Sequence, residues 1–340
     1  MRALKMALFT ALAAVMLTGC KAFHTLGTNQ KTAQGRPYEL IVVINQPLWM
    51  GEVGDSLRAL LAAPIPYLPQ VEPEFDVQRV TPDGFKSVVV DHRNILKVLV
   101  EPTLKEAAVA VQYDLTATPQ IVLLLQGPTE ESLVEYLNAH GQKLLDVLLA
   151  AERDRAVAFA KTFGVSGIEQ AAKERFGVTM AVPKGYTLAA NEADFLWARY
   201  EYPEASQGFM LYSYPYTGGK NFTVEALVKA RNRFAKRIPG PSDGSYMITA
   251  EMFEPTITTF RLNGRLWVEM RGFWDVENDF MGGPFVSYST LDTATGCIFT
   301  YDCYVYAPKL PPHKRNLMRG LEHLLYTIEL PKTASTTEAN

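Results

Sequence analysis

The stretch from Glu130 to Phe163 carries the longest helical pattern in this 340-residue chain. Its apolar residues recur at helical spacing, among them Leu133, Leu137, Leu144, Leu148, Phe159 and Phe163. Thr129 precedes the stretch as a suitable N-cap, and two glutamates follow at the positive end of the helix dipole. An unbroken helix of this length would reach roughly 50 Å at about 1.5 Å per residue. We therefore expect a long helix with a bend near Gly141 or at residues 150–151.

The size of the chain indicates two domains. Residues 20–340 exceed what one hydrophobic core usually covers. With 48% apolar and 20% charged residues, the chain has enough material for packed cores. We place the domain boundary between Phe163 and Gly177. The expected parts are an N-terminal domain that includes the long helix, a C-terminal domain and a disordered tail, over residues 38–165, 178–330 and 331–340.

Short extended runs dominate the rest of the first half. Glu39–Asn45 is a β-branched run and the first credible strand. Glu52–Leu61 reads as a helix, and a proline-rich loop ends it. Further extended runs cover residues 75–80, 95–101, 107–113 and 121–125. Together these runs predict a mainly antiparallel sheet.

The second half is richer in aromatic strands, with helices expected over residues 224–237 and 314–326. Asn263-Gly264 between two such strands is the clearest hairpin signal in the chain. The fold class we expect is α+β, with two domains that are each a mainly antiparallel sheet covered by helices. The element order here, with the opening Val182-Pro183-Lys184-Gly185-Tyr186, resembles the Mog1/PsbP-type α/β sandwich. A divergent duplication of the two halves is an alternative that rests on one short sequence similarity, between residues 92–96 and residues 314–318.

The first twenty residues have the pattern of a bacterial export signal. Arg2 and Lys5 precede an apolar run over residues 7–17, which is too short to span a bilayer. The run ends in Leu17-Thr18-Gly19-Cys20, which resembles the lipobox of bacterial lipoproteins. That resemblance implies a signal peptide over residues 1–19, a diacylglyceryl group and acyl chains such as palmitate on Cys20, and a flexible tether over residues 20–37. An ordinary cleaved signal with an incidental cysteine is the alternative.

The other cysteines and the net charge exclude several classes of protein. Cys297 and Cys303 lie six residues apart on one expected strand, about 20 Å, whereas a disulfide needs Cα atoms within about 7 Å. We therefore expect two buried, reduced thiols.

The formal charge of −3 becomes more negative once Arg2 and Lys5 are removed, which argues against nucleic acid as a partner.

Familiar catalytic and metal-binding patterns are absent from the sequence. It has no Gly-x-Ser-x-Gly, His-Glu-x-x-His or Cys-x-x-Cys motif, and its five histidines lack metal-ligand spacing. Gly218-Gly219-Lys220 lacks the first glycine of a phosphate loop, and the acidic run at 275–279 lacks the glycine of a calcium loop. We accordingly predict no metal and no cofactor.

Two long loops of the C-terminal half are the candidate ligand-binding segments, because loops of this length seldom serve connection alone. The first, 239–246, follows a basic helix. Its candidate residues are Arg233, Arg237, Ser242, Asp243, Ser245 and Tyr246. The second, 275–284, combines acids, an amide and glycines beside a tryptophan. Its candidate residues are Trp274, Asp275, Glu277, Asn278 and Asp279. A charged outer helix face and core aromatic residues are the competing interpretations.

Several segments resemble an uncharacterised family of envelope lipoproteins from Bacteroidetes-type bacteria, the domain of unknown function 4837. They include the lipobox, Arg93-Asn94-Ile95, residues 238–247, Trp274–Phe285 and Tyr306-Ala307-Pro308. The family carries no known activity, so the resemblance implies no catalytic residues. Surface-exported lipoproteins of such bacteria carry acids just after the lipidated cysteine. Lys21-Ala22-Phe23-His24 has none, which favours an outer-membrane protein that faces the periplasm.

We therefore expect a lipid-anchored cell-envelope protein that binds or scaffolds, with the membrane and an envelope protein or glycan as partners. The alternative is an envelope glycan or peptidoglycan hydrolase. Its candidate carboxylates are Glu269, Asp275, Glu277 and Asp279. Such an enzyme needs two carboxyl groups roughly 5 to 10 Å apart across a cleft. We consider catalysis the less favoured of the two interpretations.

Overall fold

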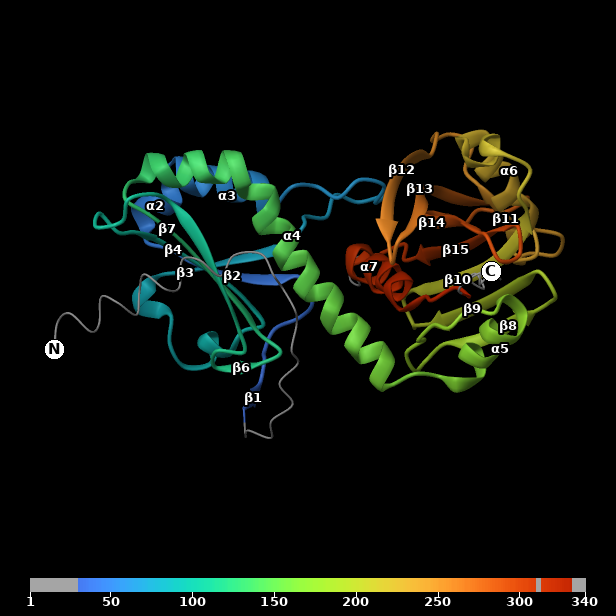
Figure 1. Ribbon diagram of the computed structural model, residues 1–340, viewed down its shortest axis with the longest axis horizontal. Helices are drawn as coiled ribbons and strands as arrows, with labels where there is room; N and C mark the ends of the chain where they lie inside the picture. Colours follow the sequence, from blue (N-terminus) through green and yellow to red (C-terminus); the bar gives the residue numbers. More distant parts are fainter. Residues whose placement is uncertain (1–29, 310–312, 332–340) are drawn as a thin grey trace, which may run out of the picture.

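The computed structural model of the protein describes residues 30–309 and 313–331. The predicted signal peptide, Cys20, the first part of the tether and the tail beyond Pro331 lie outside these residues. The described chain forms two domains side by side, joined by one long helix (Figure 1). This confirms the α+β class and the two-domain layout. The boundaries that we placed between the domains stay predictions.

A five-stranded sheet forms the N-terminal domain, with strand order β3-β2-β4-β7-β5. Its strands are β2 (Glu39–Val43), β3 (Asp76–Val80), β4 (Asn94–Val100), β5 (Ala108–Tyr113) and β7 (Ile121–Gly127). The pairs β2–β3, β2–β4 and β4–β7 are parallel, and the described partner of β5 is an antiparallel β7. The expectation of a mainly antiparallel sheet is therefore wrong for this domain. Among these strands, β2 and β7 lie inside the sheet and are almost continuously apolar, as buried parallel strands usually are, whereas the edge strand β5 is largely exposed.

Helices cover one face of that sheet, and short 3₁₀ turns cover part of the other. The helices are α2 (Gln46–Met50), α3 (Glu52–Leu61) and α4 (Glu130–Thr162), and their core includes Leu57, Leu96, Leu123 and Leu148. The turns are η2 (Pro82–Gly84) and η3 (Ser87–Asp91), with Val89 packed against Ile95. The Thr129 hydroxyl accepts a hydrogen bond from Ser132 N–H, so the predicted N-cap of α4 is confirmed.

An eight-stranded antiparallel sheet forms the C-terminal domain, as we expected. In order the strands run β11-β13-β14-β15-β10-β9-β8, and β12 also pairs with β13. They are β8 (Thr187–Asn191), β9 (Phe195–Glu201), β10 (Ser206–Pro215), β11 (Tyr246–Thr249), β12 (Thr256–Leu262), β13 (Arg265–Glu277), β14 (Gly283–Asp292) and β15 (Cys297–Tyr306). Asn263 and Gly264 both have positive φ between β12 and β13, which confirms the predicted hairpin.

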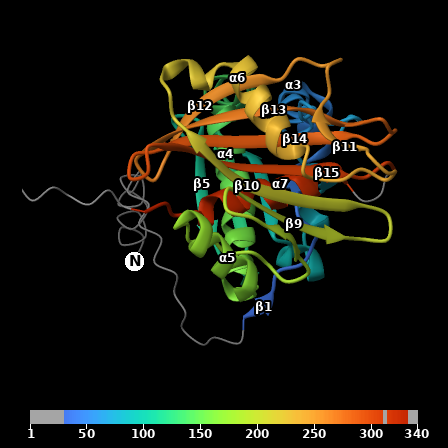
Figure 2. The same ribbon diagram turned by 90° about the vertical axis from the view of Figure 1, so that its right-hand side faces the viewer.

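The C-terminal sheet is covered on both faces. α5 (Ser166–Phe176) and α7 (Lys314–Leu324) pack on one face through Ile168 and Leu321, and α6 (Val224–Ala235) packs on the other through Phe234. Figure 2 shows α6 and α5 on opposite sides of the strands. The turns η4 (Gly219–Phe222) and η5 (Leu325–Thr327) complete the domain. A parallel sheet in one domain and an antiparallel sheet in the other do not fit the duplication alternative.

Three further expectations can be compared with the structure. Cys297 and Cys303 both lie on β15 as free thiols, but only Cys303 is buried, so the expectation of two buried thiols is wrong for Cys297. Burial raises the pKa of Cys303 well above its usual value. The tether prediction is wrong from residue 30 onward, because β1 (Lys31–Thr32) pairs with β6 (Ala117–Thr118). α4 is one continuous helix that bends along its length (Figure 1).

Candidate functional site

The two predicted loops of the C-terminal domain lie against each other. The Ser242 hydroxyl donates a hydrogen bond of 2.5 Å to Asp279 Oδ2, and Tyr246 is paired with Glu277 across β11 and β13. Ser245 closes the first loop on itself, because its hydroxyl donates to the Ser242 carbonyl over 2.6 Å. The hydrogen bond from Ser242 lowers the pKa of Asp279, which therefore stays ionised at neutral pH. The structure thus brings these five candidates together.

Other candidates have partners elsewhere. Trp274 is buried, and its indole N–H donates to the Val305 carbonyl over 3.2 Å, as the core interpretation predicted. Arg237 binds Asp194 over 2.6 Å, and Arg233 lies over the Phe234 ring. Asp275 accepts a hydrogen bond from its neighbour's backbone N–H, Asn278 has positive φ, and Asp243 is exposed. Whether the loops bind a ligand stays a prediction.

The largest cavity that we describe lies between the domains, and sequence reasoning missed it. It measures about 390 Å³. One wall comes from the N-terminal domain and α4, and the other from β12, β13, β14, α7 and η5. The residues with aromatic or charged side chains in these walls include Tyr38, Arg153, Phe260, Glu269, Arg271, Tyr288, Glu322, His323 and Tyr326. Cavities that bind small molecules occur preferentially at such domain interfaces.

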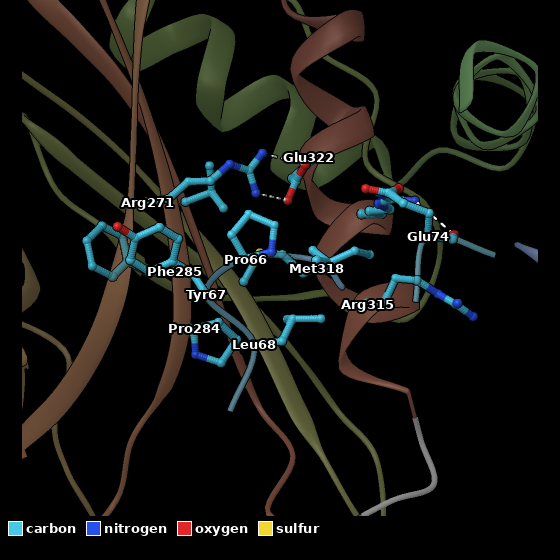
Figure 3. Close-up of a pocket in the computed structure, with 13 residues that line it drawn as sticks. Pro66, Tyr67, Leu68, Glu74, Arg271, Pro284, Phe285, Arg315, Met318 and Glu322 are labelled. Atoms are coloured by element: carbon cyan, nitrogen blue, oxygen red, sulfur yellow. Dashed lines mark hydrogen bonds and ion pairs between the residues drawn. The ribbon is translucent and has the colours of Figure 1, made fainter. Parts of the chain in front are cut away.

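A second cavity of about 220 Å³ lies beside the first along α7. The proline-rich loop after α3 closes it through Pro66 and Leu68, opposite Phe285 and Met318 of the C-terminal domain. Figure 3 shows these apolar side chains around a common space, with the Arg271–Glu322 ion pair at its edge. Arg271, Arg319 and Glu322 line both cavities.

Arg271 is the centre of the charge arrangement between the cavities. Its Nε lies 2.6 Å from Glu269 Oε1, and its Nη1 lies 2.9 Å from Glu322 Oε1. Burial alone would raise the pKa of Glu322, but the guanidinium of Arg271 outweighs it and holds that pKa below its ordinary value. One arginine thus holds two carboxylates in position and keeps Glu322 ionised at neutral pH.

A short acidic segment of the N-terminal domain holds α7 in place. Glu72 accepts hydrogen bonds from the backbone N–H groups of Lys314 (3.0 Å) and Arg315 (3.1 Å). It therefore caps α7 from the other domain, where the helix has no side-chain cap of its own. Asp76 binds the Arg315 guanidinium over 2.6 Å, and Glu74 binds Arg319. These bonds join segments about 240 residues apart in sequence.

Tyr38 and His323 form a neutral pair on the wall of the larger cavity. The Tyr38 hydroxyl lies 3.3 Å from His323 Nε2. Burial lowers the pKa of His323 to about 4, so its imidazole is uncharged at neutral pH. Burial also raises the pKa of Tyr38, which keeps its proton. The pair offers a ligand hydrogen-bonding groups without charge.

Spacing could have indicated part of this site. Glu72, Glu74 and Asp76 alternate along the chain, and Arg315 and Arg319 lie four residues apart on one face of α7. Both patterns also occur on solvated surfaces, so they do not show that the two segments meet. Among residues 30–309 and 313–331, no cluster of His, Cys, Asp and Glu is arranged to hold a metal ion. Within the same residues, no helix is long and apolar enough to cross a membrane.

Fold and site define a two-domain α+β protein with a charged, cavity-bearing interface. Residues 166–327 match the sequence model of the domain of unknown function DUF4837, and residues 33–160 match that of another, DUF8532. Both models describe domains of unknown function. The first match confirms the resemblance to that family for residues 166–327, whereas residues 33–160 are similar to a different domain of unknown function. No curated protein matches the chain.

Two solved structures show distant similarity. The first is a crystal structure of LpqN, involved in cell envelope biogenesis of Mycobacterium tuberculosis, with 14% identity and a TM-score of 0.28. The match covers 45% of this chain and 83% of LpqN. The second is the human StarD13 (DLC2) lipid transfer and protein localization domain, with 12% identity, a TM-score of 0.22, and coverage of 48% and 95%. TM-scores this low do not define a common fold.

Proposed function

We propose that this protein is a lipid-anchored binding protein of the cell envelope, and that its ligand occupies the larger interdomain cavity. The observation that carries the proposal is the cavity itself, which has about 390 Å³ and walls from both domains. This volume falls within the roughly 300–1,000 Å³ usual for ligand sites. The lipobox at Cys20 supports the envelope location, and the missing acids after it support the periplasmic face of the outer membrane.

The cavity walls suit an uncharged polar ring such as a sugar. Phe260 and Tyr326 are partly exposed and offer flat apolar faces. Arg153 stacks on the Tyr326 ring at 4.5 Å, which leaves its remaining N–H groups available to ligand oxygens. Glu269 and the uncharged His323 supply further hydrogen-bonding groups. The charges of Arg271 and Arg319 are already bound to Glu322 and Glu74, so we expect a neutral glycan rather than an anion.

Calorimetric titration of the protein with a neutral oligosaccharide of N-acetylglucosamine tests this function. We expect saturable binding that Tyr326→Ala weakens about tenfold, since stacked aromatic contacts supply much of the energy in such sites. Tyr246→Ala is the matched control, because it removes the same side chain from the predicted loops. An equal loss of affinity in both variants, or a loss in Tyr246→Ala alone, would indicate that the ligand binds at the loops rather than in the cavity. Absence of binding to the wild-type protein would contradict the proposal.

One observation bears on the hydrolase alternative. Glu269 lines the larger cavity together with Glu322, and both bind Arg271, whereas Asp279 binds Ser242 in the loops. A glycosidase needs one protonated carboxyl as general acid. The lowered pKa of Glu322 makes it a poor proton donor at neutral pH. We therefore expect no release of soluble sugar from peptidoglycan, and turnover that Glu322→Gln abolishes would instead favour the enzyme.

A further inference from the structure

The described chain begins at one end of the N-terminal domain and is fixed there. Gln30 Nε2 donates to the Asp114 carbonyl over 3.1 Å, and β1 pairs with β6. Lys31 Nζ lies 2.9 Å from Asp91 Oδ2. In Figure 1, β1 and β6 lie together at the lower end of this domain. The chain therefore enters the fold at a defined place.

Three large apolar side chains are exposed around that entry. The exposed fractions are 73% for Val88, 60% for Tyr113 and 50% for Leu115. Val88 belongs to η3, and the other two lie at and after the end of β5. Hydrogen bonds join these segments, because Thr116 Oγ1 donates to the Val90 carbonyl over 2.6 Å and Gln120 Nε2 donates to the same oxygen over 2.8 Å. Val88, Tyr113 and Leu115 thus lie on segments that contact each other, and we call these three side chains the entry patch.

The predicted lipid anchor lies close to the entry patch along the chain. Gln30 follows Cys20 by ten residues, which span at most about 35 Å when fully extended. A membrane that holds Cys20 would therefore lie within reach of this end of the domain.

We propose that the entry patch rests on the membrane and inserts Val88, Tyr113 and Leu115 into the lipid interface. This inference rests on the lipid anchor of the proposed function. Tyrosine and branched apolar side chains are the groups that favour the interface between lipid and water. The two or more acyl chains predicted on Cys20 suffice for anchoring, so the entry patch would orient the domain on the membrane rather than retain it there.

Charges of both signs lie at this end without a cluster of cations, since the exposed Asp114 lies between Tyr113 and Leu115 and the exposed Lys86 precedes Val88 by two residues. Lys31 pairs with Asp91, and Arg36 Nε lies 3.7 Å from Glu39 Oε1. Attraction to anionic lipid needs clustered unpaired cations. We therefore expect binding to neutral and anionic vesicles to be similar and to depend little on salt.

The test uses the mature chain with Cys20→Ser, so that no lipid contributes. Flotation with phosphatidylcholine vesicles should show weak binding. Combined replacement of Tyr113→Ser and Leu115→Ser should lower the partition coefficient about tenfold, since these residues supply most of the apolar area. Met252→Ser is the control, because Met252 is an apolar residue on a loop of the C-terminal domain that is even more exposed, at 85%. Circular dichroism checks that each variant is folded.

Leu115→Trp gives a second measurement, because its fluorescence should shift to shorter wavelength when vesicles are added. Unchanged flotation of the double variant, or no vesicle binding at all, would overturn the inference. A concentration-dependent dimer that the double variant abolishes would assign the patch to a second copy, and would also overturn it. Mass analysis of the N-terminal peptide from native membranes tests the lipid anchor separately, so the two failures can be distinguished.

Discussion

Arg271→Met removes the guanidinium charge that binds Glu269 and Glu322 between the two cavities. Methionine keeps most of the apolar stem of the side chain but leaves Glu269 and Glu322 without their guanidinium partner. Breaking a buried ion pair by deleting one partner costs about 3–5 kcal/mol. The three side chains are 22%, 19% and 15% exposed. Solvent therefore reduces the cost, and we expect a loss of about 2–4 kcal/mol in the free energy of unfolding.

The loss should depend on pH in a direction that the structure determines. In the wild-type protein the folded pKa of Glu322 is lowered. Its stabilising contribution is therefore present above its unfolded pKa of about 4.3 and disappears as the pH falls through the folded value. Without Arg271, burial becomes the dominant influence and raises the pKa of Glu322. The variant then binds a proton more readily when folded, so its deficit should be largest near neutral pH and smaller in acid.

Calorimetric or denaturant unfolding of both proteins at about pH 7.5 and about pH 5 measures this effect. Arg261→Met on neighbouring β12 is the matched control, because Arg261 is exposed and its loss should change stability by less than about 0.5 kcal/mol. Adding Glu322→Gln to the Arg271 variant should recover part of the stability at neutral pH. The reasoning is refuted if Arg271→Met behaves like the control, or if its deficit is equal at both pH values.

Three further predictions can be tested directly. Cys20→Ser should release the protein from the membrane fraction, and the N-terminal peptide of the wild type should carry the mass of the acyl chains; unchanged fractionation would contradict lipidation. Arg231→Met should lower the Tm by several degrees, because it strips the fully buried Asp302 of a partner at 2.9 Å. Burial raises the pKa of Asp302 even though Arg231 lowers it. The Tm deficit of Arg231→Met should therefore grow as the pH rises, and a deficit independent of pH would contradict the reasoning. The C-terminal domain, expressed as residues 166–330, should melt cooperatively, and residues 178–330 should melt at a lower temperature because α5 buries Ile168, Ala171 and Ala172; a longer fragment without a cooperative transition would contradict an independent domain.

Local signals in the sequence predicted local structure well. Thr129 and Thr223 cap α4 and α6 through their hydroxyl groups, and Asn263-Gly264 forms the predicted hairpin. These features depend on a few neighbouring residues, which the sequence shows together. The direction of the N-terminal strands depends instead on how long connections cross the sheet. The almost continuous apolar run of β2 is a sign of a parallel strand in this part of the sequence.

The candidate site also has one part that the sequence indicates and another part that it does not. The two predicted loops meet because β11 and β13, the strands beside them, pair with each other. The interdomain site could not be found by spacing, because Asp76 and Arg315 meet across 239 residues of sequence. Arg315 also looks like a residue on a solvated helix face, yet its side chain is fully buried. The ion pair with Asp76 explains why a charged side chain can be buried at that position of α7.

The long helix explains why the larger cavity is suited to preformed binding. Leu148 of α4 packs in the core of the N-terminal domain, and Ala160 of the same helix packs in the core of the C-terminal domain. Glu72 caps α7 from the opposite side of the interface. A hinge motion of the domains would therefore break the cap or bend a helix that both cores hold. Because the walls of the cavity are fixed in this way, little free energy would be lost in ordering them when a ligand binds. Recognition would then depend on the side chains already in place.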